Sequence, residues 1–166
     1  MTITVNIHAS CVVCAGAGVA FGAPADGGVL LLGDSGSGKS DLALRLIALG
    51  ARLVADDRCE IFFDGAALRA RAPRTIAGLV EIHGLGVVAL PFVPEARIVL
   101  VAHASTRDPE RLPEHRRYKP PPAVALPAHL RPPEIFVHAP TASAPVKILA
   151  AVAAFDRQLF REEIAT

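Results

Sequence analysis

Alternating and clustered hydrophobic positions along the chain predict a series of short strands. Residues 2–7 alternate between apolar and polar side chains, which is typical of a strand with one buried face. Residues 29–32 are uninterrupted Val and Leu, which favours a strand buried on both faces. A second apolar stretch begins at Cys11. Further strands are predicted at residues 52–55, 58–63, 98–101 and 135–138, with Asp64-Gly65 as a hairpin turn before a return strand at Leu68.

Two helices are predicted. Residues 41–49 are apolar on nearly every side, so this helix should be buried, and Gly50 stands where a helix ends. Near the C-terminus, Ser143 is placed as an N-cap and Pro145 as a first-turn residue. The core face of this second helix would carry Ile148, Leu149, Val152, Phe155 and Leu159.

Two segments lack a clear period. Residues 81–88 are punctuated by glycine, and residues 108–133 are rich in proline, which opposes regular sheet pairing. A loop as long as the second segment is usually functional or disordered. It carries the basic residues Arg111, Arg116, Arg117 and Lys119.

Composition limits the classes of protein that the chain can represent. Its 166 residues suit one domain over residues 1–166, and 52% hydrophobic content is ample for a core. A net charge of +1 gives no electrostatic case for nucleic acid or anionic membranes. Residues 1–10 lack the charged start of a signal peptide, and no apolar run is long enough to span a bilayer. We therefore expect a cytoplasmic protein.

The three cysteines are best explained as buried thiols. Cys11 and Cys14 form a C-x-x-C pattern, but no second pair of Cys or His has the spacing of a zinc site. Positions three apart in a strand also point to opposite faces. We favour reduced, buried thiols over metal binding or redox chemistry.

The most informative motif is Gly-Asp-Ser-Gly-Ser-Gly-Lys-Ser at residues 33–40, which fits the phosphate-loop pattern G-x-x-x-x-G-K-[ST]. It follows the predicted strand 29–32 and precedes the predicted helix 41–49, as that motif requires. The alternative is a glycine-rich turn that matches by chance, which the flanking elements disfavour.

The residue types of this motif suit polyphosphate binding. Glycines allow close backbone approach, and the N–H groups of the loop and the helix N-terminus point at the anion. Lys39 supplies charge for the β- and γ-phosphates, and the Ser40 hydroxyl can ligate Mg²⁺. The predicted ATP-binding residues are Gly33, Asp34, Ser35, Gly36, Ser37, Gly38, Lys39 and Ser40.

Asp56-Asp57, at the end of the strand after the loop helix, is the second candidate. A phosphotransferase needs carboxylates to hold the metal ion and to orient or deprotonate the acceptor. Adjacent carboxylates raise one another's pKa, which suits a base working near neutral pH. The alternative is a pair of solvated turn residues.

Three segments together resemble one family. Residues 33–40, Leu-Val-Ala-Asp-Asp-Arg at 53–58 and Glu-Ile-His-Gly-Leu-Gly at 81–86 are similar to the catalytic domain of HPr kinase/phosphorylase, over about residues 8–147. The resemblance implies an α/β fold: a P-loop, phosphoenolpyruvate-carboxykinase-like core with a mixed β-sheet and flanking helices. It also implies use of ATP and Mg²⁺ to phosphorylate a serine of HPr, a phosphocarrier of the sugar phosphotransferase system. Many members of the family also remove that phosphate.

The resemblance implies roles for individual residues. Lys39 and Ser40 match the contacts to phosphate and Mg²⁺. Asp57, with Asp56 beside it, matches the base that takes the serine proton. The remaining matches are Glu81 to a second metal-site carboxylate, His8 to a catalytic histidine and Arg111 to a catalytic arginine. Taken alone, His8 would be a strand-end residue and Glu81 a solvated charge.

The chain departs from the family pattern in several places. His83 stands where the family has arginine, and the Gly-Arg-Asn that the family has after Lys147 is absent, so these residues do not imply dephosphorylation. About ten extra residues lie around 21–28. The chain resembles the short proteobacterial form, without the N-terminal domain of longer members. Family precedent predicts a hexamer.

Two other functions stay open from the sequence. One is a small-molecule kinase in which residues 116–119 close over the phosphates as a lid. The other is a non-catalytic ATP-binding sensor, which His83 and the missing late motif leave open.

Overall fold

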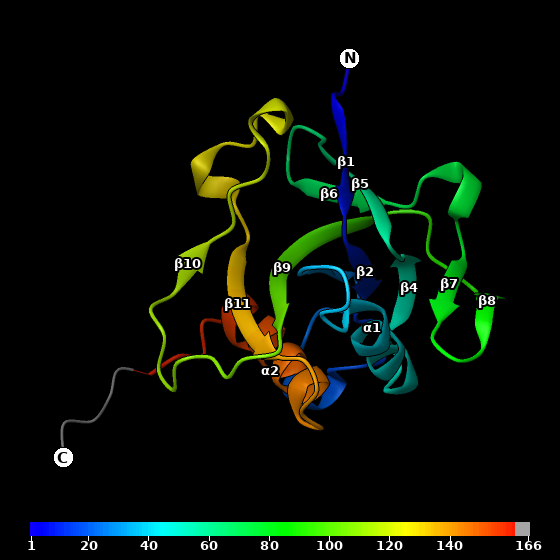
Figure 1. Ribbon diagram of the computed structural model, residues 1–166. Helices are drawn as coiled ribbons and strands as arrows, with labels where there is room; N and C mark the ends of the chain where they lie inside the picture. Colours follow the sequence, from blue (N-terminus) through cyan, green and yellow to red (C-terminus); the bar gives the residue numbers. More distant parts are fainter. Residues whose placement is uncertain (162–166) are drawn as a thin grey trace.

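The computed structural model describes residues 1–161 and shows a curved, mixed sheet with two helices packed against it (Figure 1). The predicted α/β class with a mixed sheet and flanking helices is confirmed. The helices are α1 Lys39–Ala48 and α2 Ala144–Asp156. The strands are β1 Thr4–His8, β2 Ser10–Val13, β3 Gly27–Leu32, β4 Arg52–Ala55, β5 Arg58–Phe63, β6 Leu68–Arg71, β7 Leu79–Ile82, β8 Gly86–Ala89, β9 Ala96–Ser105, β10 Arg116–Arg117 and β11 Pro133–His138.

The main sheet has the strand order β1-β5-β6-β9-β3-β2-β4, with β11 and then β10 added beside β9. Strand β9 is parallel to both β3 and β11, and the other pairs in this sheet are antiparallel. Strands β3 and β9 lie at the centre, which explains the uninterrupted apolar sequence at 29–32. The two faces of these strands bury different cores.

The two cores lie on opposite faces of the central strands. Val29 and Leu31 of β3 pack with α1 and α2, whereas Leu30 packs with β5, β6 and the proline-rich segment. This alternation is the two-residue period of a strand. The three cysteines are free and buried in these cores, as predicted from the sequence. Within residues 1–161, no helix is both long enough and apolar enough to cross a bilayer.

Two bends in the sheet create the place where functional side chains gather. Strands β1 and β2 are separated only by Ala9, and β4 and β5 only by Asp56 and Asp57. The amide of Ala9 donates a hydrogen bond to the carbonyl of Asp57 at 3.2 Å, so the two bends lie together. Asp56 also contacts Ser40 at the beginning of α1, so the two bends lie beside that end of the helix.

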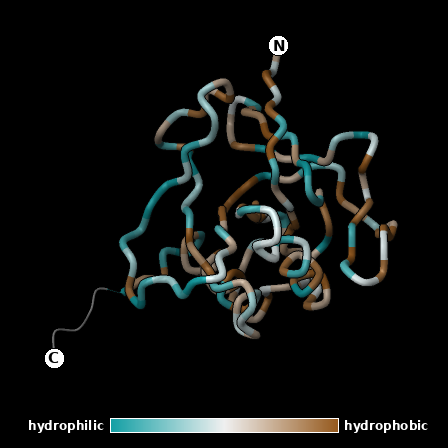
Figure 2. Tube along the Cα trace, viewed as in Figure 1, coloured by the Kyte–Doolittle hydropathy of each residue, from teal (hydrophilic) through white to brown (hydrophobic). Residues whose placement is uncertain are grey.

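The two segments without a clear period are more ordered than the sequence indicated. Residues 79–89 form the antiparallel hairpin β7–β8, a separate two-stranded sheet. The proline-rich segment contains β10 and two short 3₁₀ turns, and buries Tyr118, Val124 and Leu126 against the sheet. The part of this segment before β10, residues 108–115, is mostly hydrophilic (Figure 2). Isolated apolar residues between prolines carry no periodicity, so their burial could not be predicted.

The helix ends follow the predictions in part. At the end of α1, Gly50 has φ 110°, and the amides of Gly50 and Ala51 donate to the carbonyls of Ile47 and Leu46, which is a Schellman motif. Ser143 is the N-cap residue of α2, but its side chain makes no capping hydrogen bond. Helix α2 ends at Asp156, so Leu159 lies beyond it.

We expect Gly28→Ala to lower the free energy of unfolding by about 1–3 kcal/mol. A Cβ on Gly28 would lie 2.6 Å from the carbonyl oxygen of Arg97, in the central β3–β9 pair. Neither backbone can move without disturbing the sheet. Chemical denaturation followed by circular dichroism measures the change.

The matched control is Gly16→Ala, because its Cβ would meet only the carbonyl oxygen of Gly50 at 3.8 Å. This variant should stay within about 0.5 kcal/mol of the unmodified protein. Equal stabilities of the two variants would contradict the predicted clash at Gly28.

Candidate functional site

The predicted phosphate loop, residues 33–40, connects β3 to α1 as the sequence pattern requires. Gly38 is the N-cap residue of α1 with φ 95°, and no side chain caps this end of the helix. Amides at an uncapped helix N-terminus have no intrahelical acceptor and can bind an anion. The local geometry therefore suits a phosphate group.

The loop is held against the end of β9. A Cβ on Gly33 would lie 2.5 Å from Ser37 Oγ and 2.7 Å from the carbonyl oxygen of Ala104. Any larger residue would push the loop away from β9. Glycine at this position therefore fixes where the loop begins relative to the sheet.

Lys39 lies folded into the loop. Its Nζ donates to the carbonyls of Gly33 at 2.7 Å and Asp34 at 2.9 Å, and only 5% of the residue is exposed. Burial lowers the pKa of Lys39, and the nearby carboxylates of Asp57, Asp34 and Asp56 oppose that shift. A polyphosphate would supply stronger acceptors than two neutral carbonyls.

Asp56 is a buried carboxylate that ties three parts of the fold together. Its Oδ1 accepts hydrogen bonds from Ser40 Oγ of α1 and Ser10 Oγ of β2, both at 2.7 Å. Its Oδ2 accepts the amide of Glu81 at 3.4 Å. Only 5% of Asp56 is exposed. The carboxylate thus lies directly beside the hydroxyl at the end of the predicted phosphate loop.

Asp57 points the other way, toward solvent. Its side chain is 67% exposed, and its Oδ1 lies 3.2 Å from Nε2 of His8. The residue has φ 65°, a left-handed conformation that Asp adopts more readily than most residues. This backbone conformation turns two adjacent carboxylates in different directions. The Asp57 carboxylate is accessible to a hydroxyl group that would accept phosphate, whereas the Asp56 carboxylate is buried.

The oxygen donors present fit Mg²⁺. The Ser40 hydroxyl and the Asp56 carboxylate are hard oxygen ligands, already in contact with one another. Mg²⁺ commonly uses one or two carboxylates together with substrate phosphates rather than an all-protein cage. Within residues 1–161, no group of three or more His, Cys, Asp or Glu residues is arranged to hold a metal alone.

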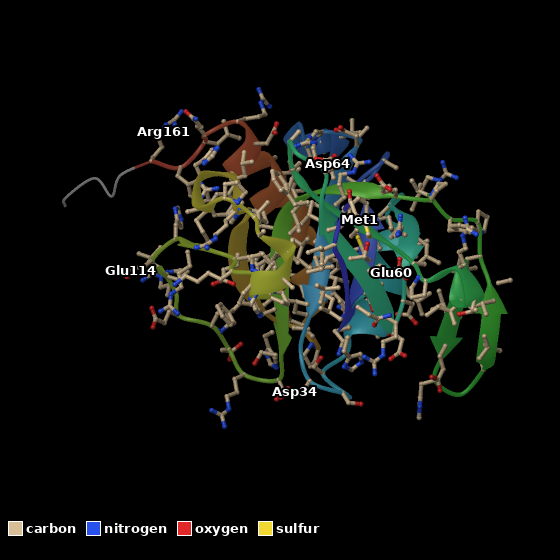
Figure 3. The ribbon with its side chains drawn as sticks, turned by 90° about the horizontal axis from the view of Figure 1, so that it is seen from above. Met1, Asp34, Glu60, Asp64, Glu114 and Arg161 are labelled. Carbon is tan, nitrogen blue, oxygen red and sulfur yellow. The ribbon has the colours of Figure 1, made fainter. Side chains whose placement is uncertain are left out.

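The structure does not bring every predicted site residue together. The amide of Glu81 contacts Asp56, but the residue is exposed in β7, and His83 lies exposed in the β7–β8 turn. Arg111 is exposed in the segment before β10. Asp34 of the predicted phosphate loop and Glu114 of that segment lie apart (Figure 3). The catalytic role of Arg111 stays a prediction.

Residues 116–119 do not form a free flap over the loop. Arg116 and Arg117 are the strand β10, which pairs with β11 at the edge of the sheet, and Tyr118 is buried. This anchoring disfavours the lid that a small-molecule kinase would need.

Two surface hollows of about 700 and 520 Å³ lie away from the predicted phosphate loop, beside Phe92 and Arg97 respectively.

Sequence reasoning missed Ser10 and Arg45. Ser10 stands in an otherwise apolar strand, and that isolated polarity is the only signal that could have found it. Arg45 of α1 donates to the carbonyls of Thr141 and Ala139, so it fixes the segment between β11 and α2 beside the predicted phosphate loop. An arginine on a helix carries no sequence signal for such distant acceptors.

The family model described as "HPr Serine kinase C-terminal domain" matches residues 2–94. A solved structure, the Hpr(Ser) kinase/phosphatase from Coxiella burnetii, matches with a TM-score of 0.69 and 23% identity. That match covers 93% of this chain and 98% of the other. At this identity the match concerns the fold, and it agrees with the α/β P-loop fold that the family resemblance implies.

Curated relatives agree with the family model. HPr kinase/phosphorylase from Limosilactobacillus reuteri is 40% identical over 91 residues, which is 50% of this chain and 28% of that protein. The protein of the same name from Aromatoleum aromaticum is 38% identical over 102 residues, or 54% of this chain and 33% of that protein. The matched segment thus spans about a third or less of either relative's length.

Proposed function

Because the chain belongs to the family of HPr serine kinase C-terminal domains, we propose that it is an ATP- and Mg²⁺-dependent serine protein kinase acting on an HPr-like phosphocarrier. In this proposal residues 1–166 form one catalytic domain. A cytoplasmic location and a hexameric assembly are further predictions, and light scattering on the purified protein tests the second.

One observation carries the proposal. The Ser40 hydroxyl contacts the buried carboxylate of Asp56, while the adjacent carboxylate of Asp57 is exposed and faces His8. A kinase needs one acid beside the metal and another beside the acceptor hydroxyl. The bend between β4 and β5 supplies both from consecutive residues.

In the proposed reaction, different side chains would bind the phosphates, hold the metal and accept the proton. The uncapped amides of α1 and the Lys39 ammonium would hold the β- and γ-phosphates. Asp56 and Ser40 would hold Mg²⁺, which when bound neutralises charge on the phosphates. Asp57 would accept the proton of the acceptor serine as its oxygen attacks the γ-phosphorus, and His8 would orient Asp57 through the 3.2 Å contact.

The forward reaction alone is proposed. The relatives' names include phosphorylase or phosphatase activity. In this chain, however, His83 replaces an arginine of the family pattern and the late Gly-Arg-Asn is absent. The same assay, supplied with phosphorylated carrier and inorganic phosphate, measures whether the chain also removes the phosphate.

Incubation with γ-labelled ATP, Mg²⁺ and an HPr-type carrier tests the proposal. We expect label on one serine of the carrier, and none on a carrier whose target serine is replaced by alanine. Transfer should stop when EDTA removes the metal. Each reaction is run beside a protein-free control and followed by mass spectrometry of the carrier.

The other outcomes identify the alternatives. ADP release with a metabolite and no carrier would favour a small-molecule kinase. ATP binding without turnover on any carrier tried would favour a nucleotide sensor. Either result would contradict the proposed protein kinase activity.

A further inference from the structure

Ser10 is a polar residue in a place that otherwise excludes polarity. Strand β2 is buried along its whole length, and its other residues are Cys11, Val12 and Val13. Ser10 itself is 0% exposed. A hydroxyl withdrawn from water destabilises the fold unless it finds a hydrogen-bond partner. An alanine would fill this position without that requirement.

The partner of Ser10 is the carboxylate beside the predicted phosphate loop. Ser10 Oγ donates to Asp56 Oδ1 at 2.7 Å, and Ser40 Oγ donates to the same oxygen at the same distance. The two hydroxyls come from β2 and α1, so they approach the carboxylate from different elements. Asp56 is thereby fixed by contacts distant in sequence.

We propose that Ser10 is a positioning residue that orients the Asp56 carboxylate for a Mg²⁺–nucleotide complex. The inference rests on the proposed function, because it requires that the site bind Mg²⁺ with ATP. If the Ser40 oxygen ligates the metal, its O–H group can still donate the hydrogen bond to Asp56. Among residues 1–161, the Ser10 hydroxyl bonds to Asp56 and not to the predicted phosphate loop, so this bond is free to persist through nucleotide binding.

Loss of the Ser10 hydroxyl should weaken the affinity for Mg²⁺ and leave the affinity for metal-free ATP unchanged. The carboxylate would keep the Ser40 hydroxyl and the longer 3.4 Å bond from the Glu81 amide, and it would turn more readily about its Cβ–Cγ bond. Metal binding would then have to order the carboxylate, and this cost would lower the affinity for Mg²⁺. Binding of ATP without metal would depend on Lys39 and the loop amides, and within residues 1–161 the Ser10 hydroxyl bonds to Asp56 rather than to these groups.

A metal titration tests this role on the whole chain. Three variants are compared with the unmodified protein: Ser10→Ala, Ser10→Cys, which keeps the volume with a weak donor, and Ser10→Thr, which keeps the hydroxyl. Ser143→Ala is the matched control, since the Ser143 side chain makes no capping bond. A fluorescent ATP analogue reports binding in EDTA and across a Mg²⁺ series, and thermal unfolding without nucleotide shows that each variant is folded.

We expect Ser10→Ala and Ser10→Cys to need about tenfold more Mg²⁺ at the midpoint, the change expected from one lost hydrogen bond to a charged group. Their affinities in EDTA should match that of the unmodified protein. Ser10→Thr should restore the midpoint to within about threefold, and Ser143→Ala should leave it unchanged. A role in folding alone would lower the unfolding temperature without moving the Mg²⁺ midpoint.

The results separate this inference from the proposed function. An unmodified protein that binds no nucleotide with Mg²⁺ overturns the proposed function, and the inference with it. An unmodified protein that binds, together with a folded Ser10→Cys of unchanged midpoint, overturns the inference alone. Should Ser10→Ala fail to fold, Ser10→Cys decides the question by the same titration.

Discussion

Replacing Asp57 with asparagine is expected to lower the rate of phosphate transfer from ATP to the carrier serine by about 10²–10⁴-fold, the usual contribution of a general base. The amide has nearly the same shape as the carboxylate but cannot take a proton at neutral pH. The backbone should be undisturbed, because φ at this position is 65° and Asn adopts left-handed conformations at least as readily as Asp.

ATP binding should survive this change. The Asp57 side chain is 67% exposed, and its Oδ1 contacts Nε2 of His8. Calorimetric titration with Mg·ATP, beside the transfer assay, separates the two effects. Asp26→Asn is the control, because Asp26 is an exposed carboxylate just before the opposite end of β3. An Asp57→Asn enzyme with unchanged turnover would remove Asp57 from the role of base.

Lys39→Met should weaken ATP binding by about 10- to 100-fold, because a charge-assisted hydrogen bond to phosphate is lost. Transfer should fall by a further 10²–10³-fold or so, since the same ammonium faces the charge that develops on the transferring group. Methionine has a similar length, so the loop should keep its volume.

The protein without nucleotide should tolerate this substitution. Burial lowers the pKa of Lys39, so the native fold disfavours its ammonium relative to water, and an apolar side chain avoids that desolvation. Circular dichroism and thermal unfolding check the fold, and Lys147→Met, an exposed position on α2, is the control. Full ATP affinity in a folded Lys39→Met protein would show that the loop does not bind phosphate through this side chain.

The sequence predicted features that depend on neighbouring residues. The strand at 52–55 and the hairpin turn at Asp64-Gly65 appear where the pattern placed them. Residues 33–40 lie between a strand and a helix because the turn, the glycines and the helix start are all encoded within one short segment. The hairpin β7–β8 was missed because its residues are mostly exposed and do not alternate.

The sequence did not distinguish Asp56 from Asp57. As neighbours in the chain they look equivalent, and a left-handed φ at Asp57 turns only one of them to solvent. Burial then separates them further, since Asp56 is enclosed by β2 and α1 whereas Asp57 faces His8. Which acid lies beside Ser40 depends on that packing.

By itself, the sequence determined the fold class, the family and the segment that would cradle phosphate, because each rests on short-range pattern or on a motif. Only the tertiary structure decided which carboxylate is buried, that Ser10 holds it and that Arg111 lies in an exposed segment. Ser10 and Asp56 meet across 46 positions of chain because β2 pairs with β4. Such pairing is set by the cooperative packing of the whole sheet, which no local pattern encodes.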